Sequence, residues 1–415
     1  MSFLITGAQM GNKGAQSMLF ITVDELKKRF PSHEVYFMTD ENYDESDFRF
    51  KKLPCNYYTK RIEVSKGVKK GAFFAYTLVH DLAKTILGQT KDVGHYRELA
   101  KIAKEIEAII DISGFAVGDK WEKWSHITYM DNILLAQKYN IPIYLMPQSF
   151  GPFKYTEEMI KIKDMLFQTL AYPRIIFARE KQGYKLLTED VGLKQVKLST
   201  DLVLQNRGID INNIYRIPPQ VSINKIFHNK NEKLVGIVPN QKCFVHGKSE
   251  RNYKIYTVII DRLLKNQCKI VLFRHSREDL EICEHLKCFY NGNDSVVLEN
   301  KELDCFEYDE FVKQFDFIIC SRFHGIVHSY RNGIPCILIG WATKYKELAQ
   351  NVGQEEFFYD ITDNDLSVDK VLNMISKMLK SYKDESKQII NNVQDIQREN
   401  CFDIVQKDLN KIGIS

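Results

Sequence analysis

Short apolar runs alternate with longer amphipathic stretches along most of the chain. The apolar runs are rich in β-branched residues and are bounded by turn-forming residues, which is the pattern of buried strands. In the first half of the chain they cover residues 3–6, 35–38, 108–113, 141–147, 175–178 and 196–199. Between them, apolar side chains recur at helical spacing over residues 14–30 and 125–139. This alternation predicts a parallel sheet with helices on both faces.

The alternation stops at residues 206–232 and then starts again. This interruption is polar, rich in asparagine and contains Pro218 and Pro219, which is the composition of a linker. Apolar runs return at residues 234–238, 270–273, 296–298, 317–320 and 336–339. We therefore predict two α/β domains at residues 1–205 and 233–365, each with a mainly parallel sheet. The sequence pattern over residues 366–415 predicts one or two C-terminal helices.

Residues 60–100 form an insertion that departs from this scheme. Residues 60–70 hold five basic side chains against one acidic side chain, and residues 71–87 follow an amphipathic pattern. A basic segment beside an amphipathic helix can lie on an anionic membrane surface, so residues 60–90 are a candidate peripheral membrane contact. The alternative, which we favour, is a helix that packs on the first domain behind a solvated basic loop.

Composition narrows the class of protein. Hydrophobic residues make up 44% and charged residues 27%, which is ordinary for a folded protein and too apolar for disorder. No apolar run approaches the roughly 18 residues of a membrane span, and the N-terminus lacks the pattern of a secretory signal. A net charge of +4 spread along the chain argues against a nucleic-acid binder and permits anionic substrates. The nine cysteines lack the spacing of zinc ligands, so we expect buried thiols in a cytoplasmic protein and name no metal-ligating residue.

Polar side chains follow three predicted strands of the first domain. Asn12 and Gly14 lie in a glycine-rich turn whose N–H groups can dock an anion or a sugar hydroxyl, or whose glycines serve only close packing. The glycine spacing matches neither a dinucleotide fingerprint nor a Walker A loop. Asp111 ends a strand, where it can accept the proton of a substrate hydroxyl or cap the next turn. Gln148 and Ser149 suit sugar hydroxyls, although the prolines beside them can serve only to shape the turn.

Cations at strand ends are the strongest chemical signal in the sequence. Arg179 follows a predicted strand and suits a bidentate phosphate or carboxylate contact, unless it forms a surface pair with Glu180. Arg322 and His324 follow another strand at the start of a predicted helix, where anions are favoured. A lone histidine is more often structural, but the arginine beside it favours a functional site. Lys344 brings a further cation to the same edge of the sheet.

These motifs, in this order, resemble the polysaccharide pyruvyl transferase family. The resemblance spans about residues 1–353 and rests on the glycine loop with Asn12 and Gly14, the PQSFGPF loop, Arg179-Glu180, Asp201 in STDLV, the S-R-F-H signature at 321–324, GIPCILIG and Lys344. It implies a fold like that of GT-B glycosyltransferases, in which two Rossmann-like domains face a cleft. The acceptor is expected on the first domain and phosphoenolpyruvate on the second.

The resemblance implies a transferase that moves the pyruvyl group of phosphoenolpyruvate onto a sugar of a surface polysaccharide or its precursor, forming a pyruvate ketal and releasing phosphate. It implies donor binding by Arg322, His324, the Phe323 backbone and Arg179. We predict His324 as the proton donor and Asp111 as the base for the hydroxyl. No cofactor is implied; a requirement for a divalent metal, a lipid-linked acceptor and the oligomeric state are left open. A cytoplasmic location is implied, with the inner face of the membrane as an option.

Two other functions remain open at this point. One is a GT-B-type glycosyltransferase that uses a nucleotide sugar. Against it, no carboxylate after the strands of the second domain is well placed to hold a ribose, and Glu347 is the one candidate left open. The other is a non-catalytic glycan-binding component, which predicts sugar affinity without donor turnover. The residues before Lys344 and the 60–100 insertion have no counterpart in the family pattern, so the acceptor sugar is open.

Overall fold

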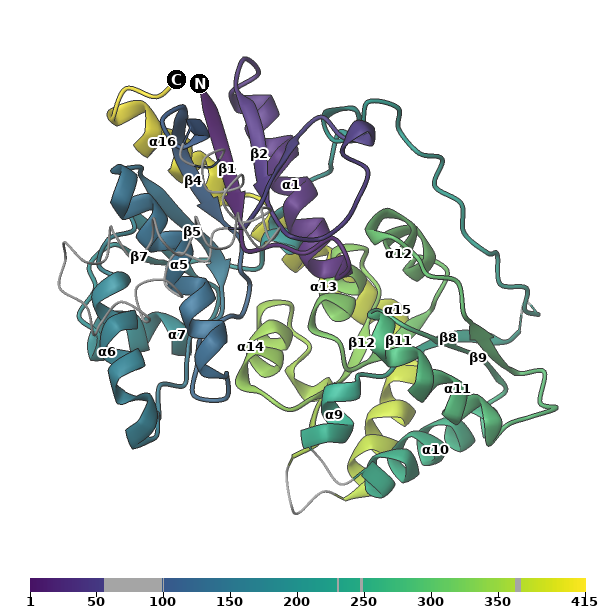
Figure 1. Ribbon diagram of the computed structural model, residues 1–415. Helices are drawn as coiled ribbons and strands as arrows, with labels where there is room; N and C mark the ends of the chain where they lie inside the picture. Colours follow the sequence, from purple (N-terminus) through teal and green to yellow (C-terminus); the bar gives the residue numbers. More distant parts are fainter. Residues whose placement is uncertain (56–98, 100, 230, 247–248, 363–366) are drawn as a thin grey trace, which may run out of the picture.

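Two parallel β-sheets, each covered by helices, form the chain (Figure 1). The computed structural model describes residues 1–415 except 56–98, 100, 230, 247–248 and 363–366. The two helix-covered parallel sheets confirm the predicted two-domain α/β class. The proposed membrane contact at residues 60–90 lies outside the described residues. No helix in the described ranges has the length and apolar character needed to cross a bilayer.

The first sheet has seven parallel strands in the order β3-β2-β1-β4-β5-β6-β7. Its apolar runs are buried on both faces, which is why they lack polar alternation. The strands are β1 (Ser2–Thr6), β2 (Glu34–Met38), β3 (Lys51–Leu53), β4 (Ile106–Asp111), β5 (Ile143–Gln148), β6 (Ile175–Ala178) and β7 (Val196–Leu198). The helices of this domain include α1 (Lys13–Arg29), α5 (Lys123–Tyr139), α6 (Ile160–Thr169), α7 (Lys181–Lys185) and α8 (Leu202–Gln205).

The second sheet has six parallel strands in the order β10-β9-β8-β11-β12-β13. They are β8 (Lys233–Val238), β9 (Cys268–Phe273), β10 (Val296–Glu299), β11 (Phe317–Cys320), β12 (Cys336–Gly340) and β13 (Phe358–Asp360). The connecting helices are α9 (Gln241–His246), α10 (Ser249–Lys265), α11 (Leu280–Cys288), α12 (Cys305–Val312), α13 (Phe323–Arg331) and α14 (Thr343–Asn351).

The two C-terminal helices connect the domains. The long helix α15 (Val368–Ile396) packs against α10 and α13 of the second domain. Helix α16 (Cys401–Lys411) returns to the first domain (Figure 1), where Asp408 accepts hydrogen bonds from Arg174 and Tyr144. The chain therefore crosses between the domains twice, which ties one to the other.

In both sheets the strand order reverses next to the first strand of the domain. The reversal lies between β1 and β4 in the first sheet and between β8 and β11 in the second. Open α/β sheets bind ligands outside the carboxyl ends of the strands at such points. Asp111 ends β4, and Arg322 follows β11 by two residues. The topology thus places predicted site residues at both reversal points.

All nine cysteines are free thiols, and seven of them are buried. Cys55 is half-buried and Cys288 is exposed. The expectation of buried thiols is therefore confirmed for most of them. The described residues contain no group of three or more His, Cys, Asp or Glu side chains arranged to hold a metal ion.

Candidate functional site

The turn from β11 into α13 is held rigidly by buried hydrogen bonds. The Ser321 carbonyl accepts from Asn240 Nδ2 at 3.0 Å and from the Tyr345 hydroxyl at 3.0 Å. The Ser321 hydroxyl is 2.5 Å from that of Tyr256. These contacts fix the backbone from which the Arg322 and His324 side chains project.

Arg322 is bound to carboxylates of its own domain. Its Nε donates to Asp279 Oδ2 at 2.7 Å and its Nη2 to Asp279 Oδ1 at 2.5 Å, and Nη2 also pairs with Glu278. The bidentate face that we expected to meet an anionic donor is therefore occupied by Asp279. Donor binding by Arg322 stays a prediction, and among the described residues only its Nη1 is left to make that contact.

The His324 ring lies directly against the backbone of α1. A Cβ at position 14 would overlap Cγ and Nδ1 of the ring, so only glycine fits there. His324 Nε2 is buried without a hydrogen-bond partner, and its 3.6 Å separation from Asp201 Oδ2 is too long for one. Burial lowers the pKa of His324, although Asp201 opposes this effect. At neutral pH the ring is therefore an uncharged imidazole, and its Nε2 has no hydrogen-bond partner among the described residues.

Replacing Gly14 with alanine is expected to destabilise the protein by about 1–3 kcal/mol, because the new Cβ pushes α1 away from His324. Chemical denaturation measures this change. Gly11→Ala is the matched control in the same turn, since a Cβ there meets only Glu41 Oε1 at 3.6 Å. Equal stability of the two variants would contradict the close contact between Gly14 and His324.

The Asn12 side chain caps α1. Its Oδ1 accepts from the N–H groups of Gly14 at 3.0 Å and Ala15 at 3.3 Å. These are the N–H groups that we expected to face a ligand. Asn12 and Gly14 therefore have local structural roles here, because the cap occupies the donors, and substrate binding by them stays a prediction.

Arg179 is the centre of a buried polar network at the carboxyl ends of β5 and β6. Its Nε donates to Ser149 Oγ at 2.9 Å and Glu180 Oε1 at 3.1 Å, and Nη1 donates to Asp201 Oδ2 at 2.9 Å. The side chains of Arg179 and Asp201 are 3% and 1% exposed. The alternative of a surface Arg–Glu pair is therefore wrong.

Asp201 joins this network to His324. Although burial raises the pKa of Asp201, His324 and Arg179 lower it overall, so the carboxylate stays ionised. Its Oδ1 accepts from the Val203 N–H at 2.9 Å, which caps α8. In the sequence Asp201 stands out only as part of the STDLV motif. Its position before an apolar stretch is a helix N-cap signal that could have identified it.

Cations from both domains meet on the ring of Phe323. Arg179 Cζ is 4.2 Å from the ring centroid and Lys344 Nζ is 5.2 Å from it. Lys344 Nζ is also 4.5 Å from the centroid of Phe115, which comes from the first domain. Burial among these rings lowers the pKa of Lys344 to about 7, and the charge of Arg179 adds to the effect. An anion bound here would relieve that repulsion.

Asp111 is 1% exposed and its partners are local. It accepts from the Thr6 hydroxyl at 2.7 Å, the Ser113 N–H at 3.1 Å and Asn132 Nδ2 at 3.0 Å. Gln148 Nε2 lies 3.5 Å from it. Burial raises the pKa of Asp111. The Ser113 contact is the turn cap that we considered as the alternative, and the role of base stays a prediction.

Glu347 of α14 spans the domain boundary. Its carboxylate accepts the N–H groups of Lys181 at 2.6 Å and Gln182 at 3.1 Å, at the start of α7. The one carboxylate that we considered for a nucleotide ribose is therefore engaged in holding the domains together.

The chain is similar to known proteins in sequence and in fold. Residues 12–343, most of the chain, match the family model described as polysaccharide pyruvyl transferase. No curated protein sequence matches the chain.

Several solved structures share its architecture. The alpha,alpha-trehalose 6-phosphate synthase of Burkholderia multivorans is 10% identical, with a TM-score of 0.56 and 99% of each chain covered. The UDP-GlcNAc 2-epimerase of Neisseria meningitidis, bound to UDP-GlcNAc, is 11% identical, with a TM-score of 0.54 over 99% of this chain and 100% of that one. The UDP-GlcNAc 2-epimerase of Methanocaldococcus jannaschii is 11% identical, with a TM-score of 0.52 over 91% and 93%. These similarities show the fold alone, and it is the GT-B-like fold that the resemblance implied.

Proposed function

Because the chain belongs to the polysaccharide pyruvyl transferase family, we propose that it transfers the pyruvyl group of phosphoenolpyruvate to a sugar of a surface polysaccharide or its precursor. The observation that supports this most is the meeting of Arg179 and Lys344 on Phe323, beside the unpaired Nε2 of His324. Phosphoenolpyruvate carries a phosphate and a carboxylate on neighbouring atoms, so its site needs fixed cations in a shielded place.

In the proposed reaction the C3 atom of the enol takes a proton, which makes C2 an oxocarbenium-like centre that a sugar oxygen attacks. The C2–O bond to the phosphate then breaks, with its electrons going to the phosphate. A second hydroxyl attacks C2 and closes the ketal ring, and its proton goes to the departing phosphate. The bound phosphate favours the protonated form of His324, which then gives its proton to the enol or to the departing phosphate. Asp111 takes the hydroxyl proton once the acceptor displaces the Asn132 amide from its carboxylate. In this proposal the acceptor binds on the side of the first domain. The protein works in the cytoplasm.

The direct test is incubation of the protein with phosphoenolpyruvate and a set of candidate acceptor glycans. Acceptor-dependent phosphate release, together with a mass increase of the acceptor equal to one pyruvyl ketal, would support the proposal. Glycan binding without phosphate release would instead indicate a glycan-binding component.

A nucleotide-sugar transferase is the second candidate, because a structure of similar fold is bound to UDP-GlcNAc. The engagement of Glu347 by the α7 amides weighs against it, since the ribose then lacks its carboxylate partner. Parallel reactions with UDP-GlcNAc and with phosphoenolpyruvate separate the two candidates, because each predicts turnover of only one donor.

Binding of phosphoenolpyruvate is expected to weaken about tenfold as the pH rises from 7 to 8.5, because Lys344, with a pKa of about 7, loses its charge over this range. Lys344→Arg should abolish this dependence, since arginine keeps its charge. Calorimetric titration at several pH values measures both. Lys346→Arg, an exposed position on the same helix, is the control. The same pH dependence in Lys344→Arg and in the unmodified protein would contradict this role of Lys344.

A further inference from the structure

Helices α1 and α13 meet through two pairs of residues, one helical turn apart. On α13, His324 and His328 are four residues apart and so lie on the same face. On α1, Gly14 and Ser17 are three apart and face them. Gly14 lies against the His324 ring, and Ser17 Oγ is 3.0 Å from His328 Nε2. The contact that positions His324 therefore continues into a second contact at His328.

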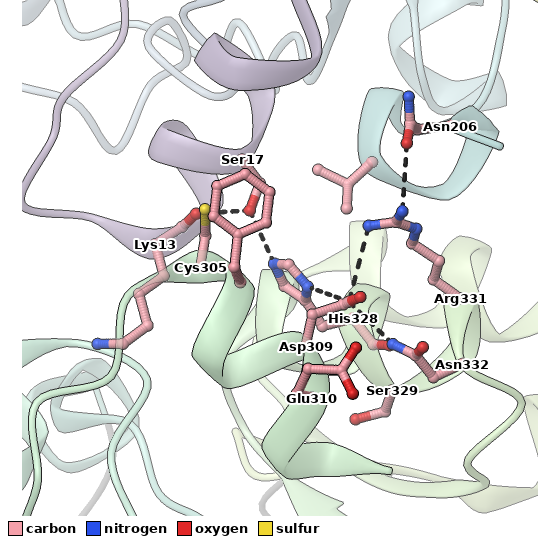
Figure 2. A network of polar contacts seen from close by, with 12 residues as sticks. Lys13, Ser17, Asn206, Cys305, Asp309, Glu310, His328, Ser329, Arg331 and Asn332 are labelled. Atoms are coloured by element: carbon pink, nitrogen blue, oxygen red, sulfur yellow. Dashed lines mark hydrogen bonds and ion pairs between the residues drawn. The ribbon is translucent and has the colours of Figure 1, made fainter. Parts of the chain in front are cut away.

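His328 is held on both sides by hydrogen bonds (Figure 2). Its Nδ1 is 2.9 Å from Asp309 Oδ1 on α12. Ser17 Oγ donates its only proton to the Lys13 carbonyl at 2.9 Å, so it accepts from His328 Nε2. These contacts tie His328 to α1 on one side and to α12 on the other. Although burial raises the pKa of Asp309, His328 and Arg331 lower it to about 2, so Nδ1 of His328 faces a carboxylate.

The order Ser17–His328–Asp309 has the composition of a nucleophile triad, but its geometry does not fit that role. A nucleophilic serine gives its proton to the histidine, whereas Ser17 donates to the Lys13 carbonyl. Ser17 and His328 are 2% and 1% exposed, so a substrate does not reach them. The rings of Phe20 and Phe306 stack at 5.5 Å across the same domain boundary. These three residues therefore act inside the boundary between the domains.

We propose that Ser17, His328 and Asp309 form a positioning unit that sets α1 on α13, and thereby holds the His324 ring against Gly14 with its Nε2 toward the donor site. Its catalytic consequence rests on the proposed function. The unit links three helices, α1, α12 and α13, and two domains through one buried imidazole ring. A shift of α1 along α13 breaks the Ser17 contact and moves the backbone on which the His324 ring rests.

Titratable groups surround His328 on the helices and the turn that pack against it. Asp309 of α12 pairs with its Nδ1, and Arg331 of α13 lies 3.7 Å from the same carboxylate. The rings of Tyr308 on α12 and His275 after β9 have centroids 5.5 and 6.2 Å from that of His328, and Lys13 of α1 donates to the His275 carbonyl at 2.7 Å. His328 lowers the pKa of His324 through its charge. Removal of that charge should therefore raise the pKa of His324.

The first test is Ser17→Ala, which removes one hydroxyl far from any substrate atom. We expect kcat for phosphate release to fall about tenfold, because the His324 ring loses its fixed place, while KM for phosphoenolpyruvate stays unchanged. The control is Ser329→Ala on α13, where an equally buried hydroxyl donates to the Gly325 carbonyl within the helix (Figure 2). An equal loss of kcat in both variants, or a change in KM alone, overturns the proposal.

The second test needs no substrate. The titration of the His324 ring, followed by NMR in His328→Gln, should move to higher pH than in the unmodified protein. If His328→Gln does not fold, His328→Asn, which also removes the ring, should shift His324 in the same direction. An unchanged His324 titration in the folded variant overturns the positioning unit. A shifted titration in a protein that fails to use phosphoenolpyruvate overturns the proposed function and leaves the unit standing.

Discussion

Replacing His324 with alanine is expected to lower acceptor-dependent phosphate release from phosphoenolpyruvate by about 10³-fold. Nε2 of the His324 imidazole is buried without a hydrogen-bond partner, and the ring lies beside the Arg179–Asp201 pair. Loss of the imidazole removes the proposed proton donor, while Arg179 and Lys344 still hold phosphoenolpyruvate. We therefore expect the loss in kcat, with a KM for phosphoenolpyruvate that changes much less.

His285→Ala is the control for this experiment, because His285 is an exposed histidine of the same domain, on α11. It should keep the full rate. A His324→Ala variant that turns over at a near-normal rate would rule out the acid assignment, whatever its effect on KM.

The strands of both sheets could be predicted because parallel strands are buried on both faces and appear as continuous apolar runs. The two exceptions are the edge strands β3 and β13, of three residues each. Lys51 and Lys52 make β3 too polar and too short to stand out as a strand. Such short edge strands are defined by their neighbours: β3 pairs with β2, and β13 with β12.

The sequence predicted which residues lie at the carboxyl edges of the sheets. It did not predict the hydrogen-bond and ion-pair partner of each residue. Arg322 binds Asp279, 43 positions away in the sequence, because β9 lies beside β8 and brings the following turn close to α13. Lys344 reaches Phe115 only because the two domains meet there. Such contacts follow from the docking of helices and domains, for which a periodic pattern carries no signal.

The sequence could not distinguish a ligand-binding glycine turn from a packing turn at Gly14. The structure assigns it to packing, and the reason lies on the other domain, where the His324 ring takes the place of a Cβ. The same holds for Ser17 and His328, which carried no motif and were not singled out. Their contact depends on the crossing of α1 and α13, which the sequence of neither helix reveals.

Replacing Arg179 with methionine is expected to lower the free energy of unfolding by about 3–5 kcal/mol, because it leaves the buried carboxylates of Asp201 and Glu180 without their cation. In the fraction that folds, affinity for phosphoenolpyruvate should fall by about 10²-fold, because the donor loses a guanidinium. Denaturation and calorimetric titration measure the two effects. Arg174→Met is the control, since Arg174 pairs with Asp408 near the other end of β6 at 39% exposure and should cost about 1 kcal/mol or less.

The pH dependence of this destabilisation identifies its cause. In the unmodified protein the pKa of Asp201 lies below its unfolded value, so its ionised form contributes stability above about pH 4, and this contribution is lost as the pH falls further. Without Arg179 that contribution shrinks. The difference in unfolding free energy between the two proteins should therefore be largest at neutral pH and decrease below about pH 4. A difference that stays constant down to pH 3 would mean that Arg179 stabilises the fold through the packing of its side chain on Phe323, and not through the buried carboxylates.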